Sequence, residues 1–145
     1  MRIVKYQTQL VKEAGFNYEA TAMSPEEVYR LLEKAFNAPR RCEEHSWQIC
    51  TDVQGRAVGL FELATGTRAA CYMDPAAVAR NAILTNASGV IISHNHPSGN
   101  ASPSKDDLQA TARVKEALAL FGITLFDHVI IGDGQYTSLR ERGAF

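Results

Sequence analysis

The chain has 145 residues, of which 46% are hydrophobic and 21% are charged, and its formal net charge at pH 7 is −1. This composition is typical of a globular protein with a single core. It excludes a long membrane-spanning segment, because no apolar run approaches the length that a bilayer requires. It also gives no electrostatic basis for direct binding of nucleic acid, which favours a basic surface.

The cysteines indicate a reducing compartment. Cys42, Cys50 and Cys71 are an odd number and show no CxxC spacing. This usage does not fit a disulfide framework. The first residues also lack the apolar core of a signal peptide. We therefore predict a cytoplasmic protein that has no contact with a membrane.

The first half of the chain predicts an arm, a helix and several strands. Apolar and polar residues roughly alternate over residues 2–12, so we expect residues 1–23 to form an edge strand or an extended arm. Ser24-Pro25-Glu26-Glu27 combines an N-cap, a proline at the first helical position and a glutamate three residues after the cap. This pattern predicts a helix over 25–37. Three strand-like runs follow, at 45–53, 57–64 and 69–73.

The second half continues the mixture of helices and strands. Asp74-Pro75 repeats the cap-and-proline pattern and predicts a helix that ends near Ser88-Gly89. Residues 90–92 are a short apolar run, typical of a strand buried on both faces. Three more elements are predicted: a helix over about 103–121, a strand over 123–131 and a hairpin strand over 136–139. This order favours an α+β fold with a mixed sheet over a doubly wound one.

The segment after the buried strand carries the clearest chemistry. His94 and His96 are two residues apart, so their imidazoles point to the same side of an extended strand. Ser104 and Asp107 lie one turn apart at the start of the third predicted helix. Two imidazoles and a carboxylate can hold zinc and leave its fourth position open, as in catalytic sites. We predict one zinc ion per chain on His94, His96 and Asp107. Ser-x-x-Asp is also a capping-box pattern, and both roles stay open.

The full spacing His94-x-His96, seven residues, Ser104, two residues, Asp107 resembles the signature of the JAMM (MPN) metalloproteases. The segments 94–99, 103–104, 127–133 and 138–141 further resemble the RadC family. The resemblance implies one JAMM/MPN domain over 24–145, with a cytidine-deaminase-like mixed sheet flanked by about three helices. RadC proteins usually carry a helix-hairpin-helix DNA-binding region in front, for which residues 1–23 are too short. The chain therefore resembles a short form of the family.

The resemblance also implies a reaction and a base. In the family a glutamate on an earlier strand, a few residues before a Gly-Thr or Gly-Ser pair, accepts a proton from water. Here the pair is Gly66-Thr67, which selects Glu62. Zinc-activated water would attack an amide or isopeptide bond of a peptide or protein substrate, with Glu62 as base. Ser104 would donate a hydrogen bond to the developing oxyanion.

Several alternatives stay open beside this interpretation. We interpret His128, which follows Asp127, as a structural residue, and leave open that it orients a metal ligand. A non-catalytic MPN-like scaffold is disfavoured because all five family positions are filled. A DNA-repair-associated, metal-dependent nuclease is disfavoured by the near-zero net charge. The early strand can also pair with a second copy, which would give a homodimer.

Overall fold

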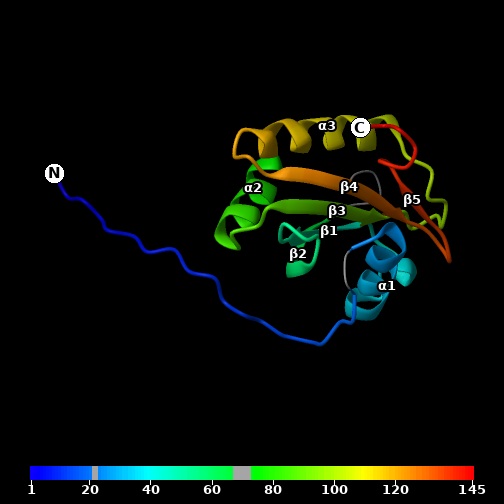
Figure 1. Ribbon diagram of the computed structural model, residues 1–145, viewed down its shortest axis with the longest axis horizontal. Coiled ribbons are helices and arrows are strands. Elements are labelled where there is room, and N and C mark those ends of the chain that lie inside the picture. The colour runs from blue at the N-terminus through cyan, green and yellow to red at the C-terminus, as the bar shows by residue number, and fades with distance from the viewer. Residues whose placement is uncertain (21–22, 67–72) are drawn as a thin grey trace.

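A mixed sheet separates one helix from two others, as Figure 1 shows. The structure is a computed structural model that describes residues 1–20, 23–66 and 73–145. It confirms the predicted α+β fold. The elements are α1 (Pro25–Phe36), the short 3-10 helix η1 (Ala38–Arg40), β1 (His45–Thr51), β2 (Ala57–Thr65), α2 (Pro75–Leu84), β3 (Gly89–Asn95), α3 (Lys105–Ala119), β4 (Thr124–Ile131) and β5 (Tyr136–Ser138).

The strand order brings three chain segments together at one end of the sheet. The order is β2-β1-β3-β4-β5. β1 runs antiparallel to β3, with Ser46 opposite His94. β3 runs parallel to β4, and α3 provides the crossover that a parallel pair requires. The start of β1 therefore lies at the same end of the sheet as the ends of β3 and β4.

Two apolar clusters hold the three layers together. On one face, α1 contributes Leu31 and Leu32 to a cluster with Trp47 and Ile49 of β1. On the other face, α2 and α3 pack on the sheet around side chains that include Ile92 of β3. Burying one such side chain contributes about 1.5–3 kcal/mol, so packing against both faces stabilises the sheet. The rigid sheet in turn fixes the positions of the strand ends.

The predicted helix boundaries are largely confirmed. The Ser24 hydroxyl accepts a hydrogen bond from the Glu27 amide at 3.2 Å, and α1 ends at Phe36 with Asn37 as its C-cap, whose φ is 53°. α2 starts as predicted but ends at Leu84, four residues earlier than the expected stop near Ser88. The Thr85 hydroxyl caps this end by donating to the Asn81 carbonyl at 2.8 Å, and Asn86 adopts a left-handed φ of 53°.

The N-terminal segment differs in part from its prediction. Residues 1–17 are exposed and form an extended arm without the expected strand. Alternation of apolar residues favours a strand only where a neighbouring strand accepts the hydrogen bonds, and the arm has none. The strand predicted over 69–73 lies outside the described residues except for Met73, which belongs to no strand. Among the described residues, no helix has the length and apolar character that crossing a membrane would require.

Candidate metal centre

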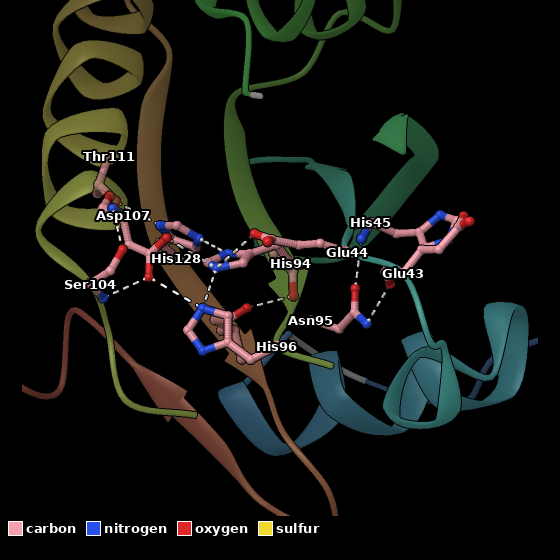
Figure 2. Close-up of polar contacts among 12 residues, drawn as sticks. Glu43, Glu44, His45, His94, Asn95, His96, Ser104, Asp107, Thr111 and His128 are labelled. Carbon is pink, nitrogen blue, oxygen red and sulfur yellow. Dashed lines mark hydrogen bonds and ion pairs between the residues drawn. The ribbon is translucent and has the colours of Figure 1, made fainter. Parts of the chain in front are cut away.

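Two imidazoles at the end of β3 face each other. Nε2 of His94 lies 2.9 Å from Nε2 of His96, and the His94 side chain is buried. Figure 2 shows both rings directed toward the start of α3. β3 ends at Asn95, so the strand positions His94 while the turn that follows positions His96. The predicted imidazole pair is thus present as a close contact.

Asp107 of α3 completes this group. Its Oδ1 lies 3.2 Å from His94 Nε2, and its Oδ2 lies 3.3 Å from His96 Nε2. Oδ2 also accepts the Ser104 amide at 2.7 Å, while the Ser104 hydroxyl accepts the Asp107 amide at 3.1 Å. The Ser-x-x-Asp pattern is therefore a true capping box, and the same box aims the carboxylate at the imidazoles. Oδ1 is the oxygen that the box leaves available.

A chain of buried hydrogen bonds determines which nitrogen of His94 carries a proton. The Thr111 hydroxyl donates to the Asp107 carbonyl at 2.6 Å, because a carbonyl can only accept. The same oxygen lies 2.6 Å from His128 Nδ1 and must accept that N–H. His128 Nε2 then accepts from His94 Nδ1 at 2.8 Å. Nε2 of neutral His94 consequently carries a lone pair and no proton.

A single hydrogen bond determines which nitrogen of His96 carries a proton. Its Nδ1 lies 2.8 Å from the carbonyl oxygen of Asn100, so Nδ1 is the donor and Nε2 of the neutral ring is bare. Two bare nitrogens and a carboxylate oxygen thus converge, and their lone pairs repel one another unless a cation or a proton lies between them. This donor set fits a divalent transition metal of the zinc type.

The pKa shifts agree with a cation-binding group. Burial raises the pKa of Asp107, but the close contacts of its carboxylate with the His94 and His96 rings outweigh burial, so the pKa lies well below the ordinary 3.8. The hydrogen bond with Asp107 raises the pKa of His96 above 6.5. Burial lowers the pKa of His128 well below 6.5. Asp107 is therefore ionised and His128 neutral at neutral pH, and a proton on His96 competes with a metal.

The structure does not bring Glu62 to this group. Glu62 Oε1 instead lies 2.8 Å from Nδ1 of His45, and its side chain is 42% exposed. The carboxylate beside the imidazoles belongs to Glu44, whose Oε1 is 3.9 Å from His94 Nε2 and whose side chain is 17% exposed. Glu44, His94 and His96 have ligand atoms within 4.8 Å of one another.

The reason for this difference lies in strand pairing. Glu62 was selected by its distance along the chain from Gly66-Thr67, and Thr67 is outside the described residues. Glu44 directly precedes β1, whose start is paired with the end of β3. The sequence shows that Glu44 is a carboxylate immediately before a buried strand. Only the pairing of β1 with β3 shows that this carboxylate lies beside His94.

His128 also has a larger part than the structural one we favoured from the sequence. Its Nε2 contacts His94, so it orients a member of the group, as the open alternative allowed. The parallel pairing of β3 with β4 places His128 opposite Ile92, two residues from His94 on the same face. This neighbourhood cannot be read from the local sequence.

The chain is similar in sequence to proteins of one family. A family model described as the RadC-like JAB domain matches residues 22–144. A UPF0758 protein of Caldanaerobacter subterraneus is 35% identical over 136 residues, which cover 94% of this chain and 57% of that protein. A UPF0758 protein of Desulforudis audaxviator is 34% identical over 128 residues, covering 88% and 55%. One from Xanthomonas campestris is 49% identical over 92 residues, covering 63% and 41%. The chain spans about half the length of these curated relatives.

Proposed function

Because this chain belongs to the family of RadC-like JAB domains, we propose that it is a metal-dependent hydrolase that cleaves an amide bond. The mixed sheet and its three flanking helices are consistent with the JAB/MPN fold. One observation carries the proposal: two unprotonated imidazole nitrogens and Oδ1 of Asp107 converge beside the Glu44 carboxylate.

We assign His94, His96 and Asp107 as the three residues that would hold one zinc ion. Imidazole and carboxylate are common zinc ligands, and three protein ligands leave a position for water or substrate. A zinc ion at such a site lowers the pKa of its water from 15.7 to about 7 and polarises a carbonyl. His128 supports this assignment, since its hydrogen bond keeps His94 Nε2 free of a proton.

Glu44 is the general base in this proposal, in place of Glu62. Its carboxylate lies within reach of the ligand group, at 3.9 Å from His94 Nε2. It is mostly shielded from solvent, which strengthens hydrogen bonds to the carboxylate. Glu44 would take a proton from the attacking water and return it to the leaving amine.

Ser104 is the proposed hydrogen-bond donor to the developing oxyanion. Its Oγ accepts the Asp107 amide at 3.1 Å, so the cap occupies a lone pair and leaves the hydroxyl proton available. One such donor contributes about 2.7–4 kcal/mol to stabilising a transition state. The capping box would thus orient a metal ligand and hold the oxyanion donor beside it.

The substrate class follows from this chemistry. We propose a peptide or protein substrate with an amide or isopeptide bond, since water, a base and an oxyanion donor serve acyl transfer. The formal net charge of −1 gives no support to direct nucleic-acid binding. Free thiols at Cys42 and Cys50 are compatible with a reducing cytoplasm as the compartment.

The test combines metal analysis with hydrolysis. Purified chain should contain about one zinc ion per molecule, and His94→Ala should remove it. A library of quenched fluorescent peptides, including one cleaved at a lysine isopeptide bond, would serve as the probe. Hydrolysis should stop after chelation and return with added zinc. Absence of stoichiometric metal in protein produced with zinc, or hydrolysis that His94→Ala leaves intact, would refute the proposal.

A further inference from the structure

Asn95 lies between the two imidazole residues but does not belong to their group. Its neighbours along the chain, His94 and His96, point to one side of β3, and alternation along a strand directs Asn95 the other way. In Figure 2 its amide is directed toward the segment that precedes β1. The residue is only 1% exposed, so its polar atoms depend on partners within the protein.

Every described partner of this amide belongs to the segment that carries Glu44. Oδ1 of Asn95 accepts the His45 amide at 2.7 Å. Nδ2 donates to the Glu43 carbonyl at 3.0 Å and to the Arg41 carbonyl at 3.4 Å. One side chain thus binds the backbone on both sides of Glu44.

A backbone contact of Glu44 itself comes from Gly66, the residue that follows β2. The Glu44 carbonyl accepts the Gly66 amide at 2.6 Å. With Asn95 holding both neighbours and Gly66 holding the carbonyl, the backbone at Glu44 has little freedom. The constrained backbone therefore limits where the Glu44 carboxylate can lie, and its Oε1 is 3.9 Å from His94 Nε2.

We propose that Asn95 is a positioning residue that holds the Glu44 carboxylate beside the metal ligands. This inference rests on the proposed function and assigns the part of the fold that keeps the base in place. Asparagine suits the task because its side chain offers one acceptor and two donors. These match one amide and two carbonyls, whereas aspartate lacks the donors and leucine lacks all three groups.

The effect of the Glu44 carboxylate can be measured on a bound metal ion, without a substrate. The full-length chain is loaded with cobalt(II), and its visible spectrum is followed against pH to obtain the midpoint for proton loss from solvent on the ion. A nearby carboxylate favours the protonated, more positive state. Glu44→Gln should therefore lower this midpoint, by about one pH unit for a charge within about 5 Å.

The variants then separate positioning from simple folding support. Asn95→Ala should lower the midpoint in the same direction as Glu44→Gln and by a smaller amount. Cobalt affinity should stay close to the wild-type value, because the Asn95 side chain bonds none of the three ligand side chains. In the Glu44→Gln background, Asn95→Ala should add nothing, since it acts through the glutamate. Asn95→Ser gives a second neutral variant, which carries the test should the alanine variant fail to fold.

Asn81→Ala is the matched control. It removes a partly buried amide that donates to Gln48 Oε1 at 3.2 Å and lies away from the ligand group. It should lower thermal stability without moving the midpoint. If the Asn95 variants have the wild-type midpoint, or shift it equally with and without Glu44, the positioning role is refuted while the metal site stands. If wild-type chain binds no cobalt, the proposed function fails first and the role of Asn95 falls with it.

Discussion

Glu44 and His94 are 50 residues apart in the chain, yet Glu44 Oε1 lies 3.9 Å from His94 Nε2. The contact exists because the start of β1 is paired with the end of β3. Glu62, on the edge strand β2, contacts His45 instead. The two glutamates thus give alternative bases with different surroundings, and a pair of isosteric variants can distinguish them.

We predict that Glu44→Gln retains the metal and lowers hydrolysis of the peptide probe by about 10²–10⁴-fold, the usual contribution of a general base. Glu62→Gln should keep nearly full activity, because glutamine can still bond His45. Both variants are assayed for zinc content and initial rate. The opposite ranking, with Glu62→Gln inactive and Glu44→Gln active, would restore the base inferred from the sequence.

The Thr111 hydroxyl should matter for metal affinity although it would not bind the metal itself. Thr111→Val removes the acceptor for His128 Nδ1–H and so releases the ring that fixes the state of His94. Loss of such an outer partner typically lowers metal affinity by about 10–100-fold. Zinc affinity is measured by competition with a chromophoric chelator.

Thr85→Val is the control for this change. The Thr85 hydroxyl makes the same type of bond, to the carbonyl four residues earlier at 2.8 Å, but at the end of α2. It should leave zinc affinity unaltered. Equal losses of affinity in both valine variants would show that helix destabilisation, and not the His128 contact, is responsible.

Ser104 combines a helix cap with the proposed oxyanion donor, and two substitutions separate these roles. Glycine is a tolerable N-cap that costs only a few tenths of a kcal/mol, so Ser104→Gly should fold and bind zinc. Its hydrolysis rate should fall by about 10²–10³-fold for the lost donor. Ser104→Thr restores a hydroxyl and should recover most of the rate. Thermal melts accompany the rates, and undiminished turnover in the glycine variant would contradict the donor role.

Zinc affinity should depend on pH through His96. The hydrogen bond with Asp107 raises the pKa of His96 above 6.5, so a proton occupies the metal-binding nitrogen below that raised value. Affinity should therefore fall as the pH drops through the raised pKa, with proton release on binding. Calorimetry in buffers of different ionisation enthalpy measures this release. A flat affinity between pH 5 and about 8 would disprove the link.

In the metal-free protein, His96 and Asp107 should make the free energy of unfolding depend on pH. The raised pKa of His96 contributes stability that is present below 6.5 and is lost as the pH rises through the folded value. The lowered pKa of Asp107 contributes stability that is present above 3.8 and is lost as the pH falls toward its folded value. Asp107→Asn should remove the dependence that comes from Asp107 and weaken the one from His96, which also bonds the Asn100 carbonyl. Denaturant unfolding at several pH values would reveal both changes.

Local signals explain why most elements could be predicted. Ser24-Pro25 and Asp74-Pro75 satisfy or avoid the free amides at a helix start, so the helices begin where the sequence indicates. His94, His96 and Asp107 could be predicted as a group for a similar reason. A strand directs alternate side chains to one face, and a capping box fixes the rotamer of its own aspartate.

The local sequence could not show which residues from distant segments contact the imidazoles and their neighbours. Glu44, His128 and Asn95 obtain their partners from strand order: β1 beside β3, and β3 parallel to β4. Strand order depends on the packing of both sheet faces against helices far away in the chain, which no single segment encodes. The sequence by itself thus determined most of the elements and the grouping of His94, His96 and Asp107, whereas tertiary packing decided which carboxylate stands beside the imidazoles and which side chains hold them.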